Sequence, residues 1–176
     1  HAQYTTGSRG VVTLVRRSLV FQVARTWTDI LGCYAAVQGE WEGEMMVLLN
    51  VYAPPGLQTA TLTGLGALLA AFPKVLAVIG GDFNLALDTH MDRMSVRTES
   101  GHTVGRLAGF TQMLGLSNIW RGLNGKKREY SFYSGAQDAF SRLDYFLVAV
   151  LWAGRFTDGK YLARGITDHS PLMTTL

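Results

Sequence analysis

The sequence contains a single cysteine, Cys33, among its 176 residues. One cysteine cannot form a disulfide within the chain, and it cannot build a zinc site based on cysteine ligands. The sequence therefore excludes a disulfide-stabilised scaffold and a cysteine-ligated zinc domain. A reducing, intracellular compartment fits this composition.

The sequence also lacks a long uninterrupted apolar run. Its most apolar window, residues 62–81, is broken by Pro73, Lys74 and several glycines, so it predicts a helix followed by a strand rather than a membrane span. Neither internal repeats nor linker-like stretches occur, and 48% of the residues are hydrophobic. We therefore expect one globular domain over residues 1–176 and no membrane partner.

Charged residues are sparse, at 16% of the chain with a formal net charge of +3. This weak positive charge is compatible with a polyanionic partner and equally with an ordinary soluble surface. Two local clusters stand out, Arg16–Arg17 and Lys126-Lys127-Arg128. Solvated loop charge is the default interpretation of such clusters, and nucleic-acid binding is the alternative.

The apolar pattern predicts short strands at intervals typical of antiparallel neighbours, with a helix inserted between two buried strands. A polar surface segment follows at 85–104. We expect strands at 11–15, 21–24, 33–37, 45–52, 75–79, 130–134, 142–150 and 171–176, and helices at 58–72 and 106–116. Mixed hairpins with interspersed helices indicate an α/β or α+β sandwich.

The most informative stretch is Lys74–Asn84, a buried strand that ends at Gly80-Gly81 and continues with Asp82 and Asn84. Two glycines allow a sharp turn or a close approach to the backbone. Asp and Asn after such glycines often only cap a turn. Taken alone, the stretch leaves capping and chemistry as equal alternatives.

Two further clusters place an acid beside an apolar run: Ser141-Arg-Leu-Asp-Tyr-Phe146 and Thr167-Asp-His-Ser-Pro-Leu172. Together with Gly81-Asp-Phe-Asn84, this ordered set resembles the signature of the endonuclease/exonuclease/phosphatase superfamily. Asn50-Val-Tyr-Ala-Pro54 and the Ser-Arg-Leu-Asp-Tyr form resemble the endonuclease domain of LINE-type (non-LTR) retrotransposons. A phosphatase or sphingomyelinase-type member and a catalytically inactive nucleic-acid-binding domain are the alternatives.

The resemblance implies a four-layer sandwich of two packed, mostly antiparallel sheets flanked by helices, and a role for each matching residue. Asp82 would orient or deprotonate the attacking water, and Asn84 would hold that water and hydrogen-bond the phosphate. His169 would donate to a non-bridging phosphate oxygen. Asp144 would pair with His169 and fix its tautomer.

The resemblance also implies contacts with metal and substrate. Asp168 would contribute to a divalent metal site for Mg²⁺, or for Mn²⁺ as an alternative. Tyr52 matches a tyrosine that contacts the substrate phosphate, and Ser141 matches a position near the nucleic acid. We predict that Arg142 and the Lys126-Lys127-Arg128 cluster bind nucleic acid as well.

The activity implied is metal-dependent hydrolysis of phosphodiester bonds by a DNA-nicking endonuclease. The expected partners are DNA and a reverse transcriptase domain downstream in the full-length protein. The expected location is the nucleus, where the DNA target lies.

The sequence departs from the family pattern at its start. Family members open with a strand carrying an asparagine and a strand ending in Gln-Glu-Thr, whose glutamate is the principal metal ligand, and neither precedes His1. No other glutamate matches that position. We therefore expect a domain that is partial at its N-terminus, lacks the first strands and has impaired activity.

Overall fold

The structure is a computed structural model that describes residues 2–3, 9–95 and 105–176. The chain divides into two compact units, His1–Asp82 and Phe83–Leu176. The prediction of one domain over residues 1–176 stays a prediction. Both units mix strands with helices, which confirms the predicted α/β class.

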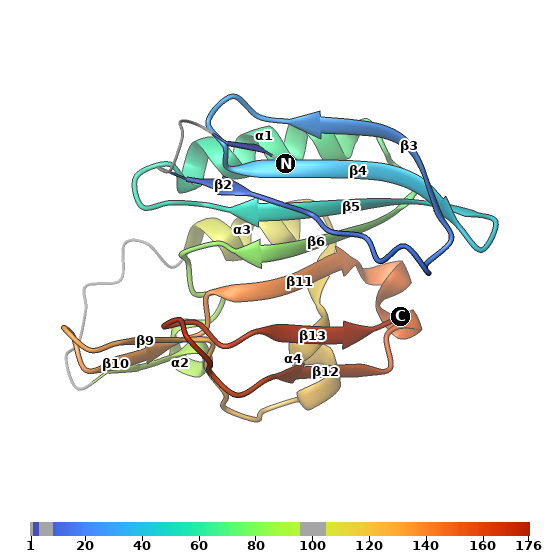
Figure 1. Cartoon of the computed structure of the whole chain (residues 1–176). Coiled ribbons are helices and arrows are strands. Elements are labelled where there is room, and N and C mark those ends of the chain that lie inside the picture. Colours follow the sequence, from blue (N-terminus) through green and yellow to red (C-terminus); the bar gives the residue numbers. More distant parts are fainter. Residues whose placement is uncertain (1, 4–8, 96–104) are drawn as a thin grey trace. The chain divides into compact units, whose positions relative to one another are not determined.

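The first unit is built on four strands in the order β3-β4-β5-β6, with helix α1 connecting β5 to β6 (Figure 1). Strands β3, β4 and β5 are antiparallel neighbours, whereas β6 runs parallel to β5. A parallel pair requires a crossover connection, and α1 provides it. The elements of this unit are β1 (Ala2–Gln3), β2 (Gly10–Val11), β3 (Phe21–Thr28), β4 (Tyr34–Trp41), β5 (Glu44–Tyr52), α1 (Gln58–Ala70) and β6 (Leu76–Asp82).

A two-residue turn joins β4 to β5. Glu42 and Gly43 both have positive φ, 52° and 80°, and the flanking residues Trp41 and Glu44 pair in register. Positive φ at both central residues is the signature of a type I′ turn, whose twist matches that of the strands it joins. The turn therefore fixes the register between β4 and β5, and β6 pairs with the other edge of β5.

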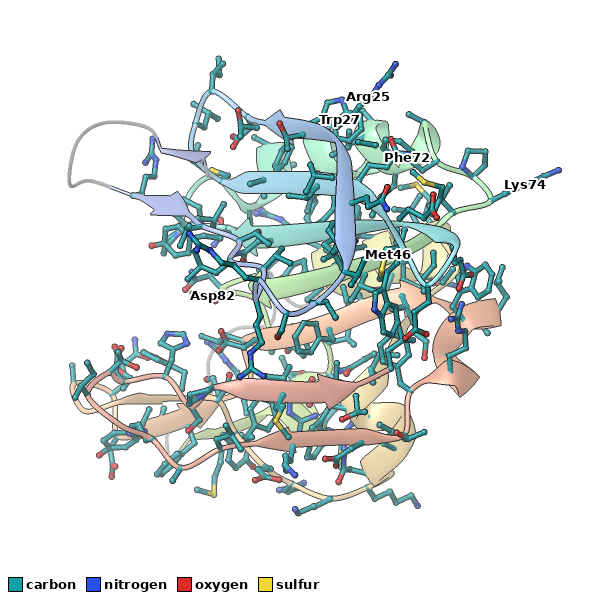
Figure 2. The ribbon with its side chains drawn as sticks, turned by 45° about the vertical axis from the view of Figure 1, so that its right-hand side comes forward. Arg25, Trp27, Met46, Phe72, Lys74 and Asp82 are labelled. Atoms are coloured by element: carbon teal, nitrogen blue, oxygen red, sulfur yellow. The ribbon has the colours of Figure 1, made fainter. Side chains whose placement is uncertain are left out.

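Helix α1 packs on the sheet through Thr61, Leu62 and Leu65, which are all buried. Just beyond its end, Phe72 meets Trp27 of β3 edge to face, with ring centroids 5.1 Å apart (Figure 2). The window 62–81 is thus a helix followed by a strand, as predicted. None of the helices in the described part of the chain is long and apolar enough to cross a membrane.

Two predictions for the first unit are wrong in detail. The strand expected at 11–15 is limited to Gly10–Val11, and Leu14 is exposed. The strand expected to end at Gly80-Gly81 continues to Asp82, so these glycines lie inside β6 and not in a turn, whereas the predicted close backbone approach is found at Gly81. Gly81 has φ 139°, and a Cβ atom there would lie 2.0 Å from the carbonyl oxygen of Val51, so glycine is needed for the close approach of β5.

In the described residues of the second unit, the strands form three small groups. Strand β11 pairs with β8, β10 lies between β7 and β9, and β12 pairs with β13, all antiparallel. The elements are α2 (Thr89–Asp92), β7 (Arg93–Ser95), α3 (Gly105–Met113), β8 (Leu116–Asn118), α4 (Ile119–Asn124), β9 (Phe132–Ser134), β10 (Ala139–Ser141), β11 (Asp144–Ala149), η1 (Val150–Arg155), β12 (Asp158–Tyr161) and β13 (Leu172–Thr175).

The polar segment expected at 85–104 is more ordered than predicted. Its described part forms α2 and β7, while residues 96–104 lie outside the described residues. Asp88 caps α2 by accepting hydrogen bonds from the backbone N–H groups of His90 and Met91. Asp88 therefore has a structural role as the N-cap of this helix.

Candidate active site

The centre of the candidate site in the second unit is a histidine–carboxylate pair. The Nδ1 atom of His169 lies 2.8 Å from Oδ2 of Asp144. A carboxylate only accepts hydrogen bonds, so Nδ1 carries the proton and substrate contact falls to Nε2. The side chains are 29% and 19% exposed, so the pair is sheltered but within reach of a ligand.

His169 is positioned by the segments on either side of it. Its backbone forms an isolated bridge with Phe132, and the two rings lie with centroids 4.9 Å apart. The hydroxyl of Thr167 accepts from the backbone N–H of His169 and donates to its carbonyl. Asp144 begins β11, and its carbonyl accepts a hydrogen bond from the hydroxyl of Tyr161 at 2.7 Å. Burial raises the pKa of Tyr161, so this hydroxyl stays protonated and keeps donating.

Asn84 lies close to the start of β11. The backbone N–H of Phe83 donates to the carbonyl of Leu143 at 2.9 Å, and Phe83 packs edge to face on Tyr145. Asn84 follows Phe83 in the chain, and Asp144 follows Leu143, so this hydrogen bond keeps Asn84 near Asp144. Asn84 has φ 48°, a left-handed conformation that asparagine tolerates better than most residues. The second unit therefore brings Asn84, Asp144 and His169 into one region.

Two predicted residues belong to the first unit, where they are neighbours. Tyr52 and Asp82 are partners in the parallel β5–β6 register, and the N–H of Ala53 donates to the carbonyl of Asp82 at 2.8 Å. Asp82 and Met46 lie at opposite ends of this strand pair (Figure 2). Tyr52 is half-buried and packs on Val11 and Ala35. These two residues thus share the strand end from which the chain continues to Phe83 and Asn84.

The described residues do not form a metal centre by themselves. Among them, no group of three or more His, Cys, Asp or Glu side chains is arranged to hold an ion. Asp168, the predicted ligand, is exposed, and its carbonyl accepts from the N–H of Tyr133 at 3.4 Å. The described residues therefore do not show a complete Mg²⁺ site, and we assign no chemical step to a metal.

Two residues predicted to bind nucleic acid are instead buried. Arg142 is 0% exposed and Ser141 is 6% exposed, so neither side chain can contact a nucleic acid in this conformation. The guanidinium of Arg142 lies 3.8 Å from the ring centroid of Trp120 and donates twice to the carbonyl of Glu129. The carbonyl of Ser141 accepts from the backbone of Ser131. We therefore assign both residues structural roles.

Asp92 is the acidic partner of the buried arginine. Its Oδ1 lies 3.1 Å from Nη1 of Arg142, an ion pair without hydrogen-bond geometry, and 2.8 Å from Nη2 of Arg121, to which it is hydrogen-bonded. Burial lowers the pKa of Arg142, and the charge of Asp92 opposes that shift. These contacts give Asp92 a structural role.

The predicted basic cluster lies on the surface, in the loop after α4. Lys126, Lys127 and Arg128 are exposed. Arg121 holds this loop, because its Nη1 donates to the carbonyls of Gly125 and Lys127 at 2.6 and 2.9 Å. Lys127 also pairs with Glu129 at 2.9 Å. The arrangement leaves the cluster available to a polyanion while its backbone is fixed.

Several residues that organise the site were missed from the sequence. Ser131, Phe132 and Thr167 all contact the segments that carry Asp144 or His169. One signal was present: Ser131 is a lone small polar residue within Tyr130-Ser-Phe-Tyr133. Polar residues inside apolar strands are costly unless they are hydrogen-bonded.

The fold is of the mixed α/β class, and its second unit carries a histidine–carboxylate pair near an asparagine. The profile of the Endonuclease/Exonuclease/phosphatase family matches residues 1–169, and the chain belongs to this family.

Solved structures with similar folds include three nucleic-acid enzymes. The AP endonuclease LMAP from Leishmania major is 17% identical with a TM-score of 0.67, covering 82% of this chain and 54% of that one. The endonuclease domain of TRAS1, a telomere-specific non-LTR retrotransposon, is 16% identical with a TM-score of 0.67, covering 92% of this chain and 70% of that one. A variant of the 3′ phosphatase NExo from Neisseria, bound to product DNA hairpin, is 18% identical with a TM-score of 0.62, covering 80% and 63%.

At these identities the similarity concerns the fold. The chain spans about half the length of the Leishmania structure.

Proposed function

We propose that this chain is a DNA-nicking endonuclease domain of the LINE-type retrotransposon kind, acting on phosphodiester bonds. The observation that carries the proposal is the hydrogen bond between His169 and Asp144, with Asn84 beside the same strand end. Part of the proposal is that a reverse transcriptase domain follows in the full-length protein and that the domain acts in the nucleus.

The chemistry follows from the orientation of the imidazole. With Nδ1 engaged by Asp144, Nε2 would donate to a phosphoryl oxygen when the ring also carries a proton there, at the place where negative charge develops in the transition state. The amide of Asn84 would add a second donor without adding negative charge. Asp82 would orient the attacking water.

The retrotransposon assignment is supported by two features. The Ser141-Arg-Leu-Asp-Tyr and Asn50-Val-Tyr-Ala-Pro stretches favour that branch, and the TRAS1 domain is among the structures with a similar fold. The exposed Lys126-Lys127-Arg128 loop supplies positive charge for a DNA backbone. Mg²⁺ dependence, with Mn²⁺ as an alternative, is also proposed and is tested by adding the ions and removing them with a chelator.

The proposal is tested by nicking of supercoiled plasmid in magnesium. We would compare the 176-residue chain, a chain extended with the two opening strands of a relative, and His169→Ala in whichever form nicks. Loss of a transition-state donor should lower the rate about 100- to 1,000-fold. His90→Ala is the matched control, because His90 is an exposed histidine of the same unit that lies in α2.

The outcomes separate the competing functions. Nicking that is lost in His169→Ala and kept in His90→Ala supports the endonuclease. A folded protein that binds DNA and nicks it in neither form overturns that proposal in favour of a catalytically inactive binding domain. Release of 3′-phosphate from a DNA hairpin without plasmid nicking would instead indicate a phosphatase.

A further inference from the structure

We propose that Ser131 is a positioning residue that holds Asp144 against His169, so that one side chain sets the geometry of the pair. This inference rests on the proposed function, in which that pair acts on the phosphate. Ser131 is 0% exposed and precedes β9 directly. It carries none of the roles that the family resemblance implies.

The hydroxyl of Ser131 is bonded to the strand that carries Asp144. Its Oγ accepts from the backbone N–H of Leu143 at 2.9 Å and from that of Asp144 at 3.1 Å. A hydroxyl oxygen has two lone pairs, and these two donors use both. The start of β11 is thereby fixed by a side chain at a point where the strand leaves the loop after β10.

The backbone of the same residue is bonded to the segment that carries His169. The carbonyl of Ser131 accepts from the N–H of Ser170 at 2.6 Å. The next residue, Phe132, forms the bridge with His169, and the N–H of Tyr133 donates to the carbonyl of Asp168. Ser131 therefore links the two partners, one through its hydroxyl and the other through its main chain.

Because the two links use different atoms of Ser131, a substitution can remove the hydroxyl and leave the main-chain link in place. In Ser131→Ala the main-chain hydrogen bond to Ser170 persists, while the N–H groups of Leu143 and Asp144 lose the hydroxyl oxygen that accepts from them. Unpaired buried donors are costly, so the start of β11 should shift to find water or another acceptor. Tyr161 cannot replace the link, because its hydroxyl bonds only to the carbonyl of Asp144 among the contacts described.

The direct readout is the low-field proton resonance of the His169 Nδ1–H group, which reports its hydrogen bond to Asp144. The resonance is assigned by its absence in His169→Gln. We expect full intensity in the wild type and in Ser131→Thr, which keeps the hydroxyl. Intensity should be weaker in Ser131→Cys, whose sulfur is a poor acceptor, and lost in Ser131→Ala.

The control is Thr111→Val, which removes another buried hydroxyl of the same unit, one that donates to the carbonyl of Ala108 within α3. It should leave the resonance unchanged. In a form that nicks, Ser131→Ala should lower kcat about 10- to 100-fold, because small displacements of catalytic groups have effects of that size.

Full intensity of the resonance in folded Ser131→Ala or Ser131→Cys overturns the inference. If Ser131→Ala does not fold, the Cys variant decides. If no form of the chain nicks, the proposed function fails, but the resonance still reports whether Ser131 positions the pair.

Discussion

The two compact units stabilise their interiors in different ways. Among the described residues of the first unit, the buried polar side chains are Gln58 and Thr61, both in α1. Its core is otherwise apolar, and the ladders of β3 to β6 satisfy the backbone. The second unit buries a larger polar set: Asp92, Thr111, Asn118, Ser131, Ser141 and Arg142.

The difference has a physical origin in strand length. Strands β3 to β6 have seven to nine residues, whereas β7 to β10 have three each. Short strands pair few backbone groups, so the connecting loops must be fixed by side chains. Arg142, Asp92 and Ser131 fix loops of the second unit through their side chains. The histidine–carboxylate pair lies in this same unit.

The largest expected effect comes from breaking the buried ion pair of the second unit. Arg142→Ala should lower the free energy of unfolding by about 3–5 kcal/mol, because it removes one of the two cationic partners of the buried Asp92 carboxylate and the guanidinium packed on Trp120. Urea unfolding of the full chain measures the change. Arg25→Ala, at an exposed arginine of β3 (Figure 2), should change it by less than about 0.5 kcal/mol. Equal effects of the two substitutions would contradict the comparison.

In the first unit, a substitution at Gly81 tests a close contact between the backbones of β5 and β6. Gly81→Ala should lower the free energy of unfolding by about 2–3 kcal/mol, because its φ of 139° suits glycine alone and a Cβ atom would meet the carbonyl of Val51. Thermal unfolding measures this. Gly109→Ala, in α3 with open space around it, should instead stabilise by about 0.5–1 kcal/mol. A neutral Gly81→Ala would show that β5 and β6 separate easily.

The two basic clusters offer a comparison of surfaces. Replacing Lys126, Lys127 and Arg128 by alanine should weaken DNA binding about tenfold and reduce the slope of log K against log salt by up to about 3. Fluorescence anisotropy at several salt concentrations measures both. Arg16→Ala/Arg17→Ala, in the exposed cluster of the first unit, serves as the control. If the control lowers the slope as much, the loop after α4 has no special role.

The smallest effect concerns an exposed ion pair, in contrast to the buried one. The hydrogen bond from Lys160, 2.9 Å away, lowers the pKa of Asp158. A lowered pKa means that the stabilisation is present above the unfolded-state pKa and is lost as the pH falls through the folded-state pKa. Lys160→Met should return the Asp158 pKa toward its ordinary value in an NMR titration. Lys126→Met should leave the pKa of Asp158 unchanged. An unchanged Asp158 pKa in Lys160→Met would rule out the hydrogen bond from Lys160 as the cause of the lowered pKa.

Local patterns in the sequence determined the long elements and the ordered motifs. Continuous apolar runs predicted β5 and β6, and the apolar face at three- and four-residue intervals predicted α1, each within a few residues of the observed bounds. The short elements β8, α4 and β12 lack such repetition, and they were missed. Asp144 and His169 were expected to pair because motif order matched a family, not because spacing required it.

Only the tertiary structure decided what the polar residues within and beside those motifs do. Arg142 and Asp144 are two positions apart, yet Arg142 is enclosed by Trp120 and Asp92 while Asp144 is half-buried beside His169. Ser131 bonds to residues 12 and 13 positions away, a relation that no local pattern encodes. Burial and long-range hydrogen bonds depend on which segments meet, so the sequence by itself identified the motif residues, and only the fold showed their surroundings and the part of Ser131.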